Sequence, residues 1–210
     1  MKILITAGPT REWLDPVRFF SNPATGRFGY LLAAEALRRG AEVYLVSGPT
    51  DLPKPDGVKF FSVETAGQME KAVLHLFPGM DCLIMTAAVS DWRPRFRREK
   101  VKCKRKFPVI FFPNPDILAA CGRIKKPGQV LIGCGLETRA LIKAAKQKIK
   151  AKNLDYILVN DPLFFGKEKG RHSSLLVSRR GEIHDLSARS KEDISRFLLE
   201  HCLAIICSTS

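Results

Sequence analysis

Short apolar runs alternate with segments of helical periodicity along most of the chain, and this alternation is the strongest constraint on its fold. Residues 2–7 (KILITA) and 42–47 (EVYLVS) are β-branched and apolar runs that predict strands, and residues 27–39 between them carry apolar side chains at helical spacing. The runs are continuous rather than alternating, which indicates strands buried on both faces. The sequence therefore predicts a Rossmann-like, three-layer α/β fold with a mainly parallel sheet.

The pattern changes near the C-terminus. Residues 173–178 and 182–186, separated by Arg-Arg-Gly, predict a β-hairpin, and a terminal helix is expected at about 191–206. With 210 residues, of which 45% are hydrophobic, the chain is long enough to bury one core, so we expect a single domain over 1–210. Between these regions the pattern predicts helices over 65–77, after Asn114-Pro115 and over 137–151, and strands over 81–88, 129–134 and 155–159.

Two long segments, residues 8–26 and 92–113, show neither the helical spacing of apolar residues nor the apolar runs of a strand. Structureless loops of this length are uncommon in a compact domain and are usually functional or disordered. The second segment is either a solvated loop or a flap over a polyanion, and its part 101–112 is a candidate strand extension that crosses to a partner subunit. Against the single acid Glu99, it holds the basic residues Arg93, Arg95, Arg97, Arg98, Lys100, Lys102, Lys104, Arg105 and Lys106.

The composition narrows the environment and the partners of the chain. Lysine and arginine number 35 against 21 aspartates and glutamates, a formal charge of +14, so the surface should attract anions. The six cysteines have irregular spacing without C-x-x-C, which speaks against a zinc site or a disulfide framework and fits a reducing cytosol. The apolar run after Lys2 is too short for a signal sequence or a membrane span. We therefore expect a soluble, cytoplasmic protein that does not bind membranes.

Ligands of open α/β sheets bind beyond the carboxyl ends of the strands, so the residues at these junctions are candidates for a site. The turn Thr25-Gly26-Arg27 opens a predicted helix, where backbone N–H groups and the helix dipole suit a phosphate. Asn22 lies just ahead of that turn, and an amide side chain can donate to a developing oxyanion without titrating. On local sequence alone, an ordinary helix start and an Asx-turn before proline are the favoured explanations of the same residues.

Later junctions are also ambiguous when each is taken alone. Asp91 is suited to accept hydrogen bonds from a ribose or to cap a helix, and residues 114–117 (NPDI) form a capping turn by their composition. Lys148 and Lys152 are four residues apart and share one helix face, where they either contact phosphates or are solvated. Cys134 is expected to be a buried structural thiol rather than a nucleophile.

Taken together in this order, the segments resemble phosphopantothenoylcysteine synthetase, also called phosphopantothenate–cysteine ligase. The resemblance covers about residues 2 to 195 and rests on ITAGPTRE-x-x-DPVR-x-x-SN, G-x-x-GY, AAVSDWRP, E-K-V-K, NPDIL, G-x-x-x-ET and KNLDYILVND. Because the match begins at Met1, it implies the free-standing bacterial-type enzyme, with the flavin-dependent decarboxylase on a separate chain.

The resemblance implies a step of coenzyme A biosynthesis. In this family 4′-phosphopantothenate and L-cysteine are joined into 4′-phosphopantothenoyl-L-cysteine. The carboxylate first attacks CTP to give an acyl-CMP intermediate and pyrophosphate, and the cysteine amine then displaces CMP. The resemblance implies Mg²⁺ as the cofactor, with ATP as an alternative nucleotide and the metal ligands unassigned. It also implies a homodimer that binds neither nucleic acid nor membranes.

The functional residues of the family carry over onto matching positions of this sequence. Asn22 and Lys100 match catalytic positions: the asparagine holds the acyl-nucleotide carbonyl, and the lysine belongs to a loop that closes over the triphosphate. The resemblance implies substrate binding by Arg18, Asn22, Thr25, Gly26, Arg27 and Ala88, and nucleotide binding by Thr86, Ala87, Asp91, Lys100, Asn114, Pro115, Asp116, Ile117, Cys134, Lys148 and Lys152.

The sequence departs from the family pattern in two places. Ala24-Thr25-Gly26-Arg27 stands where the family has Ser-Ser-Gly-Lys, so one hydroxyl is lost while a hydroxyl and a positive charge remain. Cys134 occupies the position of an aromatic residue in the bacterial Gly-Phe-Ala-Ala-Glu-Thr segment. That aromatic would supply an apolar face for the pyrimidine, so the preference for CTP over ATP is open.

Two other classes of protein share parts of the pattern. An NADP-dependent short-chain reductase would need a glycine fingerprint directly after the first strand and a Tyr-x-x-x-Lys pair, but Tyr30, Tyr44 and Tyr156 have no lysine four residues on. A basic nucleic-acid-binding module is suggested by the charge alone, and its affinity would fall steeply with salt.

Overall fold

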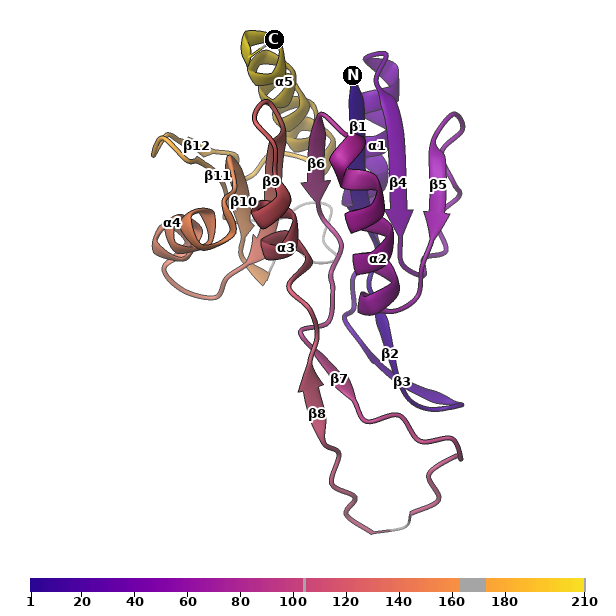
Figure 1. Ribbon diagram of the computed structural model, residues 1–210. Helices are drawn as coiled ribbons and strands as arrows, with labels where there is room; N and C mark the ends of the chain where they lie inside the picture. Colours follow the sequence, from indigo (N-terminus) through magenta and orange to yellow (C-terminus); the bar gives the residue numbers. More distant parts are fainter. Residues whose placement is uncertain (104, 163–172, 210) are drawn as a thin grey trace.

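The centre of the molecule is an eight-stranded sheet whose strand order reverses near its middle (Figure 1). The computed structural model describes residues 1–103, 105–162 and 173–209. Six parallel strands lie side by side in the order β5 (Lys59–Ser62), β4 (Glu42–Ser47), β1 (Lys2–Ala7), β6 (Cys82–Met85), β9 (Val130–Leu136) and β10 (Tyr156–Asn160). Antiparallel β11 (Ser174–Ser178) and β12 (Ile183–Asp185) extend the β10 edge, as the predicted hairpin requires. This order confirms a mainly parallel, doubly wound sheet.

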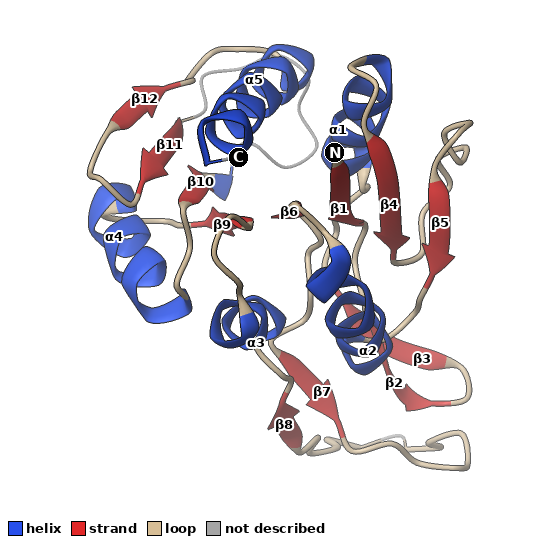
Figure 2. Cartoon of the chain, turned by 45° about the horizontal axis from the view of Figure 1, so that its top comes forward, coloured by secondary structure: helices blue, strands red, loops and turns tan. Residues whose placement is uncertain are grey.

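Helices cover both faces of the sheet (Figure 2). In β1, Ile3 and Ile5 pack into one core while Leu4 packs into the other, and all three side chains are fully buried. The continuous apolar run therefore serves two cores at once, which confirms the three-layer prediction. One core is covered by α1 (Arg27–Arg38) and α5 (Lys191–Thr209), and the other by α2 (Ala66–Leu76), the short 3-10 helix η1 (Phe77–Gly79), α3 (Ile117–Ile124) and α4 (Leu141–Lys152).

Local sequence sets the helix starts. Thr65 and Gln68 form a capping box at α2, and the Asp116 side chain accepts a hydrogen bond from the Ala119 amide at α3. The helix predicted over 137–151 begins only at Leu141, because β9 continues to Leu136 and the Glu137 amide still donates to the Asn160 carbonyl of β10. The strand predicted over 81–88 is likewise shorter and ends at Met85.

The segment 8–26 is not the irregular loop that the sequence predicts. Strands β2 (Arg11–Asp15) and β3 (Arg18–Ser21) pair antiparallel and are joined by a turn at Pro16-Val17. The Val17 amide donates to the Asp15 carboxylate at 2.9 Å, so the aspartate side chain closes the turn. The strands mix charged and aromatic residues without a clean period of two, which is why the hairpin was not predicted.

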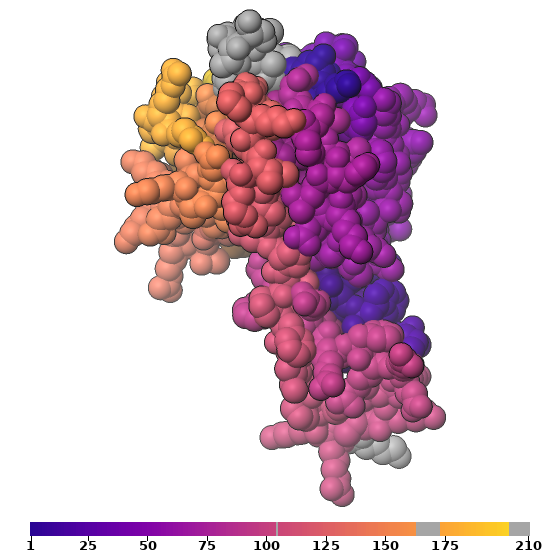
Figure 3. All heavy atoms as spheres, in the orientation of Figure 1, coloured from indigo at the N-terminus to yellow at the C-terminus, as the bar shows by residue number. Residues whose placement is uncertain are grey.

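The segment 92–113 forms a long arm that leaves the body of the molecule beside this hairpin (Figures 1 and 3). Short strands β7 (Trp92–Pro94) and β8 (Phe111–Pro113) pair antiparallel at its base. Only this short piece of the strand predicted over 101–112 is present among the described residues. The arm is fastened to the hairpin by a hydrogen bond of 2.8 Å from the Arg97 amide to the Leu14 carbonyl. Lys104, one of its basic residues, lies outside the described residues.

Several other expectations concern the chemistry of the whole chain. Cys103, Cys121 and Cys134 have free thiols. No helix in the described part of the chain is long and apolar enough to cross a bilayer.

The sequence did not predict edge strand β5, because its four residues are too few to show the two-residue period of a strand.

The packing of α3 against α4 gives a first testable prediction. A Cβ on Gly122 would lie 2.0 Å from the Lys152 carbonyl oxygen, so Gly122→Ala must push α4 away. We expect a loss of about 1–3 kcal/mol in the free energy of unfolding, measured by urea denaturation. Gly67→Ala in α2 is the matched control, because no atom lies within 4 Å of its added methyl group, and it should be neutral or stabilising. Equal stability of the Gly122→Ala variant and the wild type would contradict the close contact.

Candidate active site

A cavity of about 500 Å³ opens beyond the carboxyl ends of the parallel strands, where the strand order reverses between β1 and β6. This is where doubly wound proteins bind ligands. Fifteen of the seventeen residues that the sequence singled out line it, although they come from five separate parts of the chain. They are Asn22, Thr25, Gly26, Arg27, Thr86, Ala87, Ala88, Asp91, Asn114, Pro115, Asp116, Ile117, Cys134, Lys148 and Lys152.

Hydrogen bonds between two strand-end loops build the floor of the cavity. The Ala88 amide donates to the Gly8 carbonyl at 2.9 Å, and the Ser90 amide donates to the Thr10 hydroxyl at 3.0 Å. The loop after β6 therefore continues the ladder of the sheet beyond its last strand residue. Because Ala87 and Ala88 carry only methyl groups, a ligand can approach this stretch of backbone closely.

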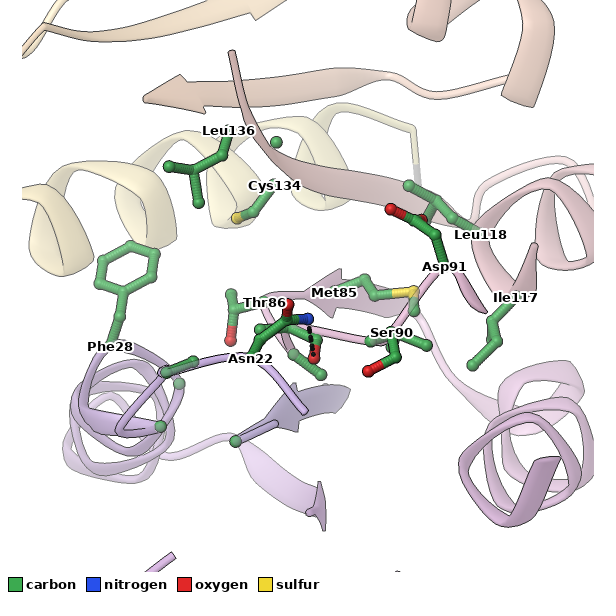
Figure 4. A pocket seen from close by; sticks show the side chains of 18 of the residues that line it. Asn22, Phe28, Met85, Thr86, Ser90, Asp91, Ile117, Leu118, Cys134 and Leu136 are labelled. Carbon is green, nitrogen blue, oxygen red and sulfur yellow. Dashed lines mark hydrogen bonds between the residues drawn. The ribbon is translucent and has the colours of Figure 1, made fainter. Parts of the chain in front are cut away.

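Asn22 spans the opening between these loops (Figure 4). Its Nδ2 donates to the Ala88 carbonyl at 3.0 Å, which fixes the amide group against the backbone after β6. An asparagine amide has two N–H bonds, so the second remains available to a ligand oxygen.

The start of α1 is pressed against the sheet. A Cβ on Gly29 would lie 2.6 Å from the Ala7 Cβ and 2.7 Å from the Thr86 hydroxyl oxygen, so only glycine allows this approach. Gly26 precedes the helix with φ of 80°, has no side chain to cap it, and no acidic residue lies in the first turn. The N-terminus of α1 is therefore well suited to an anion.

The opposite side of the cavity holds paired charges. Lys148 contacts Glu137 at 2.5 Å and Lys152 contacts Asp116 at 2.8 Å, so the two lysines do share one face as predicted. Burial opposes ionisation of Asp116, but the Lys152 and Ala119 hydrogen bonds outweigh it and hold the pKa of the carboxyl below its usual value. Burial raises the pKa of the Cys134 thiol to about 12, which agrees with an unreactive structural cysteine.

Arg18 and Lys100 do not line this cavity. Arg18 Nη1 donates to the Asp15 carboxylate at 3.1 Å and to the Val101 carbonyl at 2.8 Å, and the Val101 amide donates to Asp15 at 3.0 Å. Asp15 and Arg18 thus fasten the arm to the β2–β3 hairpin at Val101, the residue next to Lys100. The expected active-site flap is present as a segment, but it projects from the body of the molecule (Figure 3), and the described residues among 95–113 do not line the cavity.

Some lining residues were not singled out from the sequence. Lys191, the first residue of α5, lines the same cavity as Arg27, and Phe28, Leu136 and Asn160 are among the other lining residues. Local sequence gives no signal for Lys191, because its place depends on the hairpin β11–β12 returning the chain to α1. Among the described residues no three His, Cys, Asp or Glu side chains gather to hold a metal ion.

The fold and the cavity define a doubly wound α/β protein whose site, at the reversal of strand order, is lined by cations and by exposed backbone suited to small polyanions. Comparison with known sequences is more specific, since the family model described as the DNA/pantothenate metabolism flavoprotein C-terminal domain matches residues 1–205. The chain belongs to this family, and the resemblance to phosphopantothenoylcysteine synthetase is confirmed at that level.

Individual relatives agree with this assignment. The coenzyme A biosynthesis bifunctional protein CoaBC of Borreliella burgdorferi is 35% identical over 95% of this chain, and that of Bacillus subtilis is 38% identical over 97%. The chain spans about half, 51%, of the length of each of these curated relatives. The crystal structure of the C-terminal domain of a CoaBC protein is 35% identical and superposes with a TM-score of 0.85 over 99% of this chain and 96% of that one.

The fastening of the arm is testable by hydrogen exchange. Burial opposes ionisation of Asp15, but hydrogen bonds from Val101, Val17 and Arg18 outweigh it and hold its pKa below 3.8. Asp15→Ala should make the Val101 amide exchange about tenfold faster, because its acceptor is gone. Because the pKa of Asp15 is lowered, the same loss is expected in the wild type only at a pH below the usual titration range of an aspartate, where this carboxylate takes up a proton. Glu99→Ala is the matched control on the arm, and equal exchange in both variants would contradict the role of Asp15.

Proposed function

We propose that the chain is a phosphopantothenate–cysteine ligase, which joins 4′-phosphopantothenate and L-cysteine into 4′-phosphopantothenoyl-L-cysteine in coenzyme A biosynthesis. The observation that carries the proposal is the cavity, where fifteen residues from separate family motifs meet around one opening. The names of the bifunctional CoaBC relatives place those proteins in coenzyme A biosynthesis, which supports the same pathway for this chain.

In the first step the carboxylate of 4′-phosphopantothenate attacks the α-phosphorus of CTP. An oxygen–phosphorus bond forms, the bond to the β-phosphate breaks, and pyrophosphate leaves with an acyl-CMP as the other product. Both reactants are anions, so the protein has to bring them together and offset their repulsion. Lys148 and Lys152, which pair with Glu137 and Asp116, would bind phosphate oxygens on the nucleotide side, and the backbone at Ala87-Ala88 allows close approach.

In the second step the amine of cysteine attacks the carbonyl of the acyl-CMP. Negative charge develops on the carbonyl oxygen, and CMP leaves as the amide forms, while the proton of the amine passes to solvent or phosphate. Asn22 is placed to stabilise that oxygen, because one N–H of its amide is held by Ala88 and the other is available.

Mg²⁺ belongs to this proposal as the ion that accompanies the triphosphate and neutralises part of its charge. Magnesium sites at nucleotides use one or two carboxylates together with phosphate oxygens. Among the residues that the structure describes, Asp91 and Asp116 are the acidic side chains that line the cavity, so this donor set fits the ion, and these two residues would meet it.

The proposed assembly is a homodimer formed through the hairpin and the arm. Phe19 and Phe20 of β3 and Phe111 and Phe112 of β8 are 40–46% exposed, and the rings of Phe20 and Phe111 lie 5.2 Å apart. Exposed aromatic groups next to one another are typical of subunit interfaces. Such a dimer would carry Lys100 toward a second copy, which accounts for its distance from the cavity of its own chain.

A coupled assay tests the function. Purified protein with Mg²⁺ and CTP should release pyrophosphate only when 4′-phosphopantothenate is present, and CMP should appear only after cysteine is added. A parallel reaction with ATP determines the nucleotide preference, which is open because Cys134 replaces the aromatic residue of the family. A protein that releases no pyrophosphate from any nucleoside triphosphate would overturn the proposal.

The role of Asn22 gives a sharper prediction. Asn22→Asp removes the N–H donors and adds a charge that repels the oxyanion, so the second step should slow by about 100-fold or more while the first persists. Rapid quench should therefore show a burst of pyrophosphate and accumulated acyl-CMP, with little amide product. Urea denaturation checks that the variant is folded. Amide formation at the wild-type rate would remove Asn22 from the mechanism.

A further inference from the structure

A second cavity, of about 420 Å³, lies between α4 and the turn that joins β11 to β12, and it shares no lining residue with the candidate active site. Ser178, the last residue of β11, pairs with Tyr156, the first residue of β10, so the turn lies at the amino-terminal end of β10. Figure 1 shows α4 beside β10 and β11 at the flank of the molecule. We call this cavity the α4 groove, and it is lined by Lys146, Ile149, Lys150, Asn153, Ser178, Arg179, Arg180 and Gly181.

Four basic side chains and no acidic one are among the described residues that line the α4 groove. Lys146, Lys150 and Arg180 are exposed, and the side chains of these three residues make no ion pair or hydrogen bond with another described residue. The lysines of α4 that line the active site, by contrast, are paired with carboxylates. Lys146 and Lys150 are four residues apart, a helical spacing at which like charges repel each other. The groove therefore concentrates positive charge that no described side chain neutralises.

The fourth cation, Arg179, holds the wall of the groove in place. Its Nε donates to the Leu154 carbonyl at 2.9 Å, and its Nη2 donates to the side chain of Asn153, the residue that ends α4. Asp155 lies 3.9 Å from the same Nε, but the Lys125 ammonium contacts both oxygens of that carboxylate and offsets its charge. The turn and the end of α4 are thus fixed to one another, which lowers the entropic cost of binding a ligand between them.

The size and the chemistry of the α4 groove favour a small polyanion. Its volume falls within the range of small-molecule sites in proteins. None of its described lining residues is aromatic, so it offers no stacking platform for the bases of a single-stranded nucleic acid. Lysine and arginine side chains make charge-assisted hydrogen bonds to phosphate oxygens, and several of them converge here without a competing carboxylate. A chain of two or three phosphate groups matches these features.

The dipole of α4 explains only part of this charge. Cations are favoured near the C-terminus of a helix, and the effect falls off within the last turn. Lys150 lies in that turn, but Lys146 precedes it, and Arg180 belongs to a different element. The convergence of these residues on one cavity therefore needs another explanation.

We propose that the α4 groove is a second anion site, which binds the oligophosphate chain of a nucleotide or of an inorganic oligophosphate. Lys146, Lys150 and Arg180 contact the phosphate oxygens, while Arg179 holds the turn. The inference goes beyond the proposed ligase function and does not depend on it. It also gives a role to positive charge that the candidate active site leaves unused.

Amide chemical shifts during a titration with inorganic triphosphate test this site. The Gly181 amide reports on the α4 groove, and the Ala88 amide reports on the candidate active site. Lys150→Gln and Arg180→Gln should each raise the Kd read at Gly181 about three- to tenfold, because a charge-assisted contact at an exposed site is lost. Any Kd read at Ala88 should stay unchanged. Lys143→Gln is the matched control, since Lys143 is exposed on α4 but lines neither cavity.

Two comparison ligands define what the groove recognises. Orthophosphate should bind about tenfold more weakly than triphosphate, because it contacts fewer of the cations. Equal affinity for CTP and triphosphate at Gly181 would show that the phosphate chain alone is recognised, and tighter binding of CTP would identify a nucleotide as the ligand.

Two results would overturn the inference. One is a Gly181 amide that does not shift with triphosphate or CTP. The other is an equal loss of affinity in Lys143→Gln and Lys150→Gln, which would indicate attraction by the overall charge without a site. Unchanged shifts outside the groove verify that each variant is folded. Absence of ligase activity would remove the proposed function but would leave the outcome at Gly181 as it is.

Discussion

The reversal of strand order between β1 and β6 is the constraint on which the site depends. At this point the chains that leave the two strands must turn toward opposite faces of the sheet, which opens space between them. Here the space does not simply widen, because the Ala88 amide bonds to Gly8 and the Ser90 amide bonds to Thr10. These bonds hold the two loops together for several residues beyond the strands. The cavity therefore has a rigid floor of backbone, and Asn22 is anchored to that floor rather than to a side chain.

Much of the fold follows from the sequence because β1, β4, β6, β9 and β10 are buried on both faces. A strand such as β1, where Ile3 and Leu4 enter different cores, has to be apolar throughout, and that pattern is visible without any structure. The hairpin β2–β3 and edge strand β5 lack this signal, since they are covered on at most one side. Helix α4 starts late because pairing with β10 extends β9, a tertiary effect that no local period contains.

The residues of the site fall into the same two groups: some are predictable from local sequence, and others are placed by tertiary contacts. Residues that follow a buried strand directly, such as Ala88 or Cys134, are predictable from the end of the strand, and the parallel sheet then brings them to one edge. The capping turn at Asp116 shows that the structural and the functional interpretation can both hold, because the residue caps α3 and lines the cavity at once. Lys191 was beyond sequence reasoning, since its place results from α5 packing on α1 after the β11–β12 hairpin.

The positions of Arg18 and Lys100 bear on the proposed homodimer. Arg18 uses its guanidinium to hold the arm, and the buried Asp15 carboxylate joins the two. Moving Lys100 into the cavity of the same chain would break this set of hydrogen bonds and leave the Asp15 charge without its partners, at a large cost. A second copy that meets the hairpin and the arm avoids that cost, because both stay as they are while Lys100 gains an anion. The fastening of the arm therefore favours a site completed between subunits over a flap that folds back on its own chain.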